Sequence, residues 1–149
     1  MELTYKKTTT QLLHEIFEHN TIVDFFSENC QEFTELSLSA FLNSMLAKHN
    51  IKKAEVFRRA GLVGNNYGYE LFRCDRKTPS RDILLRLCLA FPMTIDETQL
   101  ALKNAELATL YPRNKRDAYI LFALKNTLSL DELDELLYEK GLDPLSRNT

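Results

Sequence analysis

Residues 51–91, IKKAEVFRRAGLVGNNYGYELFRCDRKTPSRDILLRLCLAF, contain the pattern that decides the fold. Inside this stretch, Val56, Phe57 and Ala60 recur at helical spacing, which predicts a short helix from Lys53 to Ala60. Gly61 follows at the position where a residue with a left-handed backbone stops a helix. The stretch therefore opens with a short helix that ends in a defined turn.

A second short helix is predicted after that turn. Residues 62–66, LVGNN, are typical of a turn, and the segment from Tyr67 to Arg73 follows with Leu71 and Phe72 as its apolar anchors. Asn65 or Asn66 can cap this helix by accepting hydrogen bonds from its first backbone amides. Ser80 then caps a longer helix, whose apolar positions are Ile83, Leu84, Leu87, Cys88 and Phe91. Two short helices around a turn, inside a helical bundle, are the plan of a helix-turn-helix unit.

Helices are also predicted on the N-terminal side of this unit. The segment from Thr8 to Asn20 carries one apolar stripe, and the segment from Ile22 to Phe33 is a second apolar run. Together they form a short helical arm, whose apolar side chains must pack on the rest of the chain or on a second copy. From Leu38 to His49 the apolar spacing predicts an amphipathic helix of about three turns.

On the C-terminal side, two capping boxes mark helix starts. Thr94 with Glu97, and Ser129 with Glu132, have the spacing at which side chains and backbone amides satisfy one another. Between them a helix is predicted over 115–126, and its apolar spacing places these residues inward: Ala118, Leu121, Phe122 and Leu124 or Lys125.

These elements predict an all-α protein, because no strand-like alternation and no repeat is present. We expect an N-terminal helical arm (1–36), a helix-turn-helix domain (37–106) and a C-terminal helical extension packed on it (107–149). The helix-turn-helix domain is predicted to share one core, formed by Leu42, Leu46, Val56, Leu71, Leu84 and Leu87.

Composition agrees with this fold class. The 149 residues are 44% hydrophobic and 27% charged, and only four glycines and four prolines are present, which favours helices over a turn-rich β-sandwich. No apolar run is long enough to span a bilayer, so we expect no membrane partner. Residues 1–10 lack an apolar signal core, and the three cysteines are widely spaced with no CxxC. These features predict a cytoplasmic protein without a disulfide.

Charge is distributed unevenly along the chain. The net charge is −2, but residues 1–47 hold two basic and seven acidic residues, and residues 87–149 hold seven basic and ten acidic. Residues 48–86 hold ten basic and four acidic residues, a local charge of +6. A basic middle between acidic flanks favours an anionic partner, with chance clustering on a solvated face as the alternative.

No pattern of catalytic or metal-binding residues is present. His14, His19 and His49 lack the spacing of metal ligands, and the sequence contains no GxSxG, HExxH or phosphate-binding glycine loop. We therefore expect no enzyme activity, no metal and no cofactor.

The segment from Leu42 to Phe91 resembles the lambda-repressor-like, Cro/C1-type (XRE-type) helix-turn-helix family. The similarity lies in Asn50-Ile51 at the start of the second helix, in Ala60-Gly61-Leu62 at its end, and in Arg76-Lys77 followed by Pro79-Ser80. Thr94 to Glu97 is similar to the start of that family's last helix, and residues 92–145 are similar to an extension of some bacterial members. The resemblance implies a bacterial transcription regulator that binds double-stranded DNA, with a dimer on two half-sites about one helical turn apart.

The resemblance also suggests roles for individual residues. The candidates for contacts to base edges are Asn65, Asn66, Tyr67 and Tyr69, and the candidates for phosphate contacts are Lys52, Lys53, Arg58, Arg73, Arg76 and Lys77. Three alternatives remain open at this point. An asparagine can serve only as a helix cap, Tyr67 can belong to the core, and Arg58 and its neighbour Arg59 cannot share one face, so that one of them is a solvated charge.

The sequence departs from the family pattern at several positions. Phe57 stands where a small residue is usual, and Val63-Gly64 lengthens the turn. The usual Glu-Asn-Gly after the recognition helix is replaced by residues around Arg73-Cys74-Asp75. Gly68 lowers helix stability by about 1 kcal/mol relative to alanine, and Glu70 adds a negative charge. These departures favour the alternative function, a protein–protein interaction module of adaptor or antitoxin type. The dimer surface is expected on the arm (8–35) or on the C-terminal helices (114–140).

Overall fold

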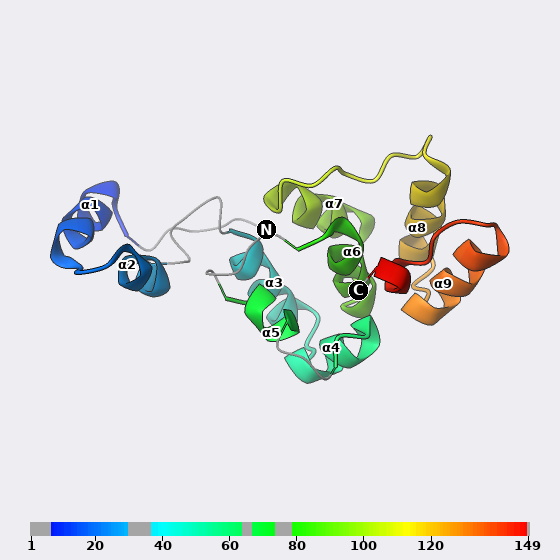
Figure 1. Ribbon diagram of the computed structural model, residues 1–149, viewed down its shortest axis with the longest axis horizontal. Helices are drawn as coiled ribbons and strands as arrows, with labels where there is room; N and C mark the ends of the chain where they lie inside the picture. The colour runs from blue at the N-terminus through cyan, green and yellow to red at the C-terminus, as the bar shows by residue number, and fades with distance from the viewer. Residues whose placement is uncertain (1–6, 30–36, 64–66, 74–78, 149) are drawn as a thin grey trace.

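The computed structural model describes residues 7–29, 37–63, 67–73 and 79–148, and within these segments the secondary structure is entirely helical. Figure 1 shows the helices in chain order. Their bounds are α1 Thr9–Glu18, α2 Ile22–Asn29, α3 Ser37–Lys48, α4 Lys53–Ala60, α5 Tyr67–Leu71, α6 Arg81–Ala90, α7 Ile95–Asn104, α8 Lys115–Lys125 and α9 Leu130–Glu139, followed by the 3₁₀ helix η2 Leu145–Asn148. The prediction of an all-α protein is confirmed for this part of the chain.

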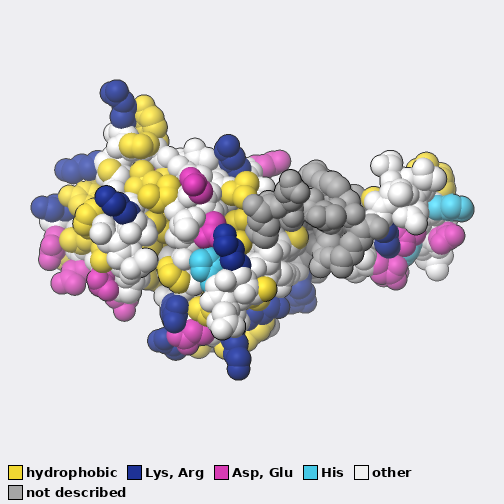
Figure 2. Space-filling model, turned by 180° about the vertical axis from the view of Figure 1, so that it is seen from behind, with side chains coloured by type: hydrophobic (Ala, Val, Ile, Leu, Met, Phe, Trp, Pro, Cys, Tyr) yellow, Lys and Arg dark blue, Asp and Glu magenta, His cyan; other side chains and the backbone are white. Residues whose placement is uncertain are grey.

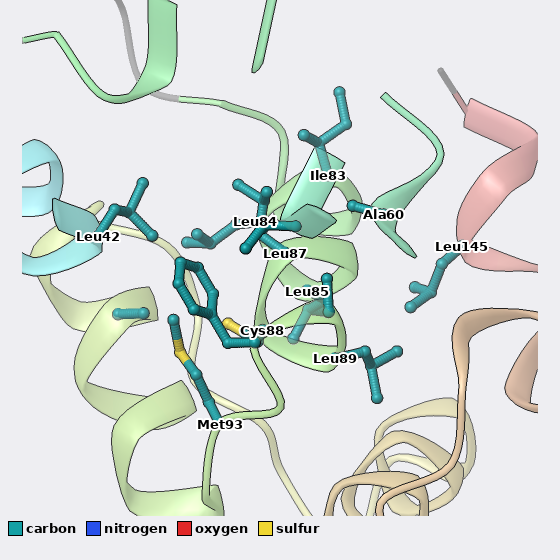
Figure 3. Close-up of a cluster of buried hydrophobic side chains, with 14 of the residues drawn as sticks. Leu42, Ala60, Ile83, Leu84, Leu85, Leu87, Cys88, Leu89, Met93 and Leu145 are labelled. Atoms are coloured by element: carbon teal, nitrogen blue, oxygen red, sulfur yellow. The ribbon is translucent and has the colours of Figure 1, made fainter. Parts of the chain in front are cut away.

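Helix α6 forms the centre of the core. Every residue from Ile83 to Ala90 is buried, as expected of a helix that is covered on all sides. It packs against α4, α7, α9 and η2. In Figure 3, Leu84 lies on the side of Leu42 from α3, whereas Leu89 lies on the side of Leu145 from η2. The predicted core residues are buried, except that Leu46 is half-buried at its edge.

Local hydrogen bonds start and stop the helices where the sequence predicts. Thr94 and Ser129 each open a helix with a capping box, and Ser80 accepts a hydrogen bond from the amide of Ile83 at the start of α6. Gly61 ends α4 with φ of 71°, a left-handed conformation that glycine adopts without steric cost. Thr8 opens α1 with a further capping box, with Gln11 as the second partner.

Two reciprocal ion pairs join the start of α6 to the start of α8. Arg81 donates to both carboxylate oxygens of Asp117, at 3.0 and 2.9 Å. Arg116 donates to both oxygens of Asp82, at 2.9 and 3.0 Å. Arg81 also donates to the carbonyls of Ala108 and Thr109. We call these four side chains the α6–α8 clamp.

The clamp explains one error in the predicted face of α8. Ala118 and Phe122 were expected inward, but both are exposed. The buried positions are Asp117, Ile120, Ala123 and Leu124. Because Arg81 holds Asp117 against α6, the helix turns its inward face about one residue away from the face expected from apolar spacing alone.

The arm consists of α1 and α2, which pack on each other and lie at the left in Figure 1. His19 connects them, since its Nδ1 is 2.7 Å from the carbonyl oxygen of Glu15 and its Nε2 is 2.7 Å from the carboxylate of Glu28. Within the segments that the structure describes, no helix is both long and apolar enough to cross a bilayer.

Candidate functional site: the α4–turn–α5 surface

The candidate site is the surface of α4, the turn after it, and α5. Helix α4 buries Val56, Phe57 and Ala60 against the core. Its end is fixed by the buried Arg86 of α6, whose Nε donates to the carbonyl of Ala60 at 2.8 Å and whose Nη2 donates to that of Gly61 at 2.9 Å. The start of the turn is therefore anchored by charge-assisted hydrogen bonds.

Helix α5 lies closely on α4 because Gly68 leaves room for Phe57. A Cβ atom on Gly68 would lie 2.8 Å from Cε1 of Phe57, closer than packed carbon atoms approach. The family pattern has the small residue on the first helix, and here it is on the second. The large side chain of Phe57 and the missing side chain of Gly68 thus compensate each other in one contact between α4 and α5.

Aromatic rings fix α5 further. The ring of Phe57 makes edge-to-face contacts with Tyr69, at a centroid distance of 4.6 Å, and with Phe72, at 5.6 Å. The amide of Asn43 in α3 donates to the carbonyl of Phe72 at 3.0 Å. Helix α5 ends at Leu71, two residues before the predicted end, because Phe72 and Arg73 form a tighter final turn.

The two tyrosines of α5 have different environments. Tyr69 is 49% exposed, and its ring is held from one side by Phe57. Tyr67 is half-buried and packs against the edge of the core. Of the two tyrosines predicted to contact bases, Tyr69 is therefore exposed to solvent. Tyr67 is partly buried, which is closer to the alternative that it belongs to the core.

Three cations of this surface make no ion pair with any residue that the structure describes. Lys52 and Arg73 are exposed. Lys53 is half-buried, with its ammonium 5.3 Å from the centroid of the Phe72 ring, a cation–π contact. Lys53, at the start of α4, thus contacts the ring that follows the end of α5.

The two arginines of α4 share one carboxylate. Arg58 donates to both carboxylate oxygens of Glu55, from Nε to Oε2 at 3.0 Å and from Nη2 to Oε1, and Arg59 donates from Nε to Oε1 at 3.0 Å. Arg58 lowers the pKa of Glu55 to about 2, with a further contribution from Arg59, so this carboxylate stays charged. Both arginine side chains are exposed, in agreement with the expectation that at least one of them is a solvated charge. Both nevertheless reach Glu55, because they lie three and four positions after it.

Other cations of the basic stretch serve the fold. Lys48 lies 2.5 Å from Oε2 of Glu97, and the imidazole of His49 lies 3.2 Å from Oε1. Burial alone would raise the pKa of Glu97, but Lys48, the Thr94 backbone amide and His49 outweigh it, and the pKa is lowered. Arg81 belongs to the α6–α8 clamp and Arg86 holds the end of α4. Among the described residues, Glu97 and Asp117 are the carboxylates that other parts of the chain bring into ion pairs with cations of this stretch, so its charge of +6 is only partly compensated.

Figure 2 shows the distribution of charge on one face. Lys and Arg side chains are spread over this face, and one group of them lies at the lower edge, around the position of α4, with carboxylates among them. Four predicted contact residues, Asn65, Asn66, Arg76 and Lys77, lie outside the described residues, and their roles stay predictions. Cys30 and Cys74 also lie outside them, while Cys88 is a buried free thiol.

The sequence analysis missed a hollow next to this surface. It has a volume of about 480 Å³ and lies between the end of α4, the end of α6 and the start of α9. Arg58 and Arg59 line one side, and Asp131 and Glu132 line the other. Its walls come from segments more than sixty residues apart, so no local pattern signals it. Its charges are balanced, and it selects no ligand of one sign.

The histidines take structural places. His49 joins α3 to α7 through Glu97, and His19 joins α1 to α2. His14 is exposed, with its Nδ1 3.9 Å from Glu18. Among the described residues, no group of three or more His, Cys, Asp or Glu side chains is arranged to hold a metal ion.

Comparison with known proteins gave no match of any kind. Neither a family model nor a curated protein nor a solved structure matches the chain.

Proposed function

We propose that the protein is a transcription regulator of the lambda-repressor-like, XRE type, which binds double-stranded DNA with the α4–turn–α5 surface. In such a unit, the first helix braces on the phosphate backbone and the second presents side chains to the major groove. Support comes from the order of helices α3 to α7 and from the close seating of α5 on α4. Support also comes from the side chains of Lys52, Tyr69 and Arg73, which are exposed on this surface.

The observation that carries the proposal is a set of cations at the start of α4 and just after the end of α5. Lys52, Lys53 and Arg73 lack an ion pair among the described residues, whereas Lys48, Arg58, Arg59 and Arg81 are paired with carboxylates. Cations held without a carboxylate partner are available to phosphates, which supply most of the affinity of a DNA-binding surface. The predicted phosphate contact at Arg58 is weaker, since Glu55 already neutralises part of its charge.

Within this proposal the side chains have distinct roles. Tyr69 contacts bases, because it is outward and its ring is oriented by Phe57. Lys52 and Arg73 contact phosphates, which position the protein without reading sequence. Asn65, Asn66, Arg76 and Lys77 remain candidates for the same two roles.

A salt titration on DNA tests the proposal. The ligand is a pool of random double-stranded DNA, from which bound fragments are selected and sequenced, and affinity is then measured at several salt concentrations. We expect a selected consensus and a logarithm of affinity that falls linearly with the logarithm of salt concentration. The double variant Lys52→Glu/Arg73→Glu should lower the affinity and reduce the salt slope by about 2, one for each lost phosphate contact.

The matched control is Lys103→Glu/Lys125→Glu, which reverses two exposed lysines outside α4 and α5. This control changes the net charge by the same amount, but at positions outside the proposed DNA-binding surface. It should therefore leave most of the affinity for DNA intact. Absence of a salt-sensitive, sequence-selective complex, or equal losses in both double variants, would reject the proposal.

A protein–protein interaction module on the same scaffold is the second candidate. The Glu55 carboxylate favours it, because this group lowers the positive charge of α4 where a backbone phosphate would lie. The same titration separates the two functions. An adaptor needs no consensus in the DNA selection, whereas a regulator does.

A further inference from the structure

Most of the apolar side chains that the structure describes in the arm are exposed. Leu13, Ile16 and Phe17 follow one another at i, i+3 and i+4 on α1, and Ile22 and Val23 begin α2. Their exposed fractions are 54%, 45%, 80%, 57% and 65% in that order. We call these five residues the arm face. Yellow side chains of the arm are visible at the right in Figure 2.

Two helices this short do not hold their structure alone. Helix α1 has ten residues and α2 has eight, and isolated helices shorter than about 12–15 residues are marginal in water. Phe25 is the arm's one buried apolar side chain among those the structure describes. Ordering both helices costs more conformational entropy than this single side chain and a few surface contacts return. The arm therefore needs a further apolar surface.

We propose that the arm face binds the arm face of a second copy of this chain, which makes the arm the dimer interface. A patch that packs on itself across a two-fold axis is the usual way in which identical chains associate. Burying these five side chains on both copies removes roughly 1,000 Å² of surface from water, which reaches the lower limit of a specific interface. The product is a bundle of four short helices, two from each copy.

Other occupants fit the arm less well. From Lys7 to Asn29 the arm carries four carboxylates and one lysine, so it repels the phosphates of DNA and of anionic lipids. The C-terminal helices are the other expected dimer surface, and they expose Phe122 and Tyr138. Those helices already bury Ile120, Leu133 and Leu137 within the chain, so they are stable without a partner.

This inference deepens the proposed function, because a dimer would present two α5 helices to two half-sites. Its test does not use DNA, however. A dimeric protein that does not bind DNA would contradict the proposed function and support the proposed interface. A monomeric protein that binds DNA would do the reverse.

Sedimentation equilibrium of the full chain measures the interface directly. We expect twice the chain mass of 17.3 kDa at about 100 μM protein. Phe17→Glu should raise the dimer dissociation constant about 100-fold, because it places a carboxylate at the most exposed apolar position of the arm face. The matched control is Phe122→Glu, at an exposed aromatic residue of α8, and it should leave the dissociation constant unchanged.

Salt distinguishes this interface from docking onto the basic surface of α4 and α5. Two acidic arms repel each other, so raising NaCl from about 0.1 to 0.5 M should strengthen an arm–arm dimer. A dimer formed by contact between the acidic arm and the basic surface of α4 and α5 would instead weaken as the NaCl concentration rises. The circular dichroism melting transition of Phe17→Glu shows that the rest of the chain remains folded. A monomeric wild-type chain, a dimer that survives Phe17→Glu or is lost with Phe122→Glu, or a dimer that weakens with salt would each overturn the proposal.

Discussion

At the scale of single residues, the contact between Phe57 and Gly68 decides how closely α5 approaches α4. Two effects oppose each other when Gly68 is replaced by alanine. The helix gains about 1 kcal/mol of propensity. The new methyl group, however, would meet the Phe57 ring at 2.8 Å, and Tyr69 and Phe72 hold that ring from two sides.

We therefore expect Gly68→Ala to lower the free energy of unfolding by about 1–2 kcal/mol, because overpacking outweighs propensity. Urea unfolding measures this change. In a Phe57→Leu background the ring is absent, and the same substitution should become neutral or stabilising. If Gly68→Ala stabilises the wild-type protein, the ring is free to move and the packing account is wrong.

The core makes a second prediction at this scale. Leu84 is completely buried at the centre of α6, beside Leu42. Leu84→Ala should lower the free energy of unfolding by about 2–5 kcal/mol, because it leaves a cavity in a packed core. Leu100→Ala, on the exposed side of α7, is the control and should cost much less. A loss below about 1 kcal/mol for Leu84→Ala would contradict the central place of α6.

At the scale of elements, the α6–α8 clamp attaches the C-terminal helices to the core. Asp117 is 5% exposed and accepts hydrogen bonds from Arg81 and from the amide of Tyr111. Asp117→Asn should lower the free energy of unfolding by about 3 kcal/mol, since it leaves a partly buried guanidinium without its carboxylate. Asp131→Asn is the matched control, because Asp131 is an exposed acid in the first turn of α9 and contributes about 0.3–1 kcal/mol through the helix dipole.

The difference in free energy of unfolding between wild type and Asp117→Asn depends on pH with a definite sign. Burial would raise the pKa of Asp117, but Arg81 and the Tyr111 amide outweigh it, and the folded pKa lies below the ordinary value of 3.8. The stabilisation is thus complete above pH 3.8 and is lost as the pH falls through the folded pKa. Unfolding titrations should show wild type and Asp117→Asn converging in acid. A constant difference would exclude Asp117 as the cause.

The arm has its own pH dependence. Both ring nitrogens of His19 face acceptors, the Glu15 carbonyl and the Glu28 carboxylate, so only the imidazolium can donate to both. The Glu15 carbonyl and then the Glu28 carboxylate raise the pKa of His19 above 6.5. The arm should be most stable below pH 6.5 and should lose protection as the pH rises through the folded pKa. Hydrogen exchange of the α1 and α2 amides measures this loss, after correction for the intrinsic pH dependence of exchange. His19→Gln should abolish it, and a loss that persists in that variant would point to another group.

At the scale of the whole molecule, the uneven charge of the sequence has two different outcomes. In the basic stretch, the folded chain brings carboxylates from elsewhere to the cations, as Glu97 comes to Lys48 and Asp117 to Arg81. In the arm, charged side chains pair locally, as Lys7 does with Glu15 and His19 with Glu28, and the apolar side chains of the arm face remain exposed. The surface that we propose for DNA and the surface that we propose for self-association are thus at different places on the chain, so substitutions can test them separately.

The sequence by itself determined the helices, because their signals are local. Capping boxes at Thr94 and Ser129, the glycine stop at Gly61 and the apolar spacing from Leu38 onward all act within a few residues, and each is found where the pattern placed it. The fold class and most of the core followed from the same signals.

Only the tertiary structure decided which side chains are free to act. Lys48, Arg81 and Lys53 are all cations in the sequence, yet the fold gives the first two carboxylate partners and places the third on an aromatic ring. It also decided the inward face of α8 and joined Phe57 to Gly68 as one packing unit. Such outcomes depend on contacts between residues far apart in the chain, where Coulomb energy and packing act through space and leave no local pattern to read.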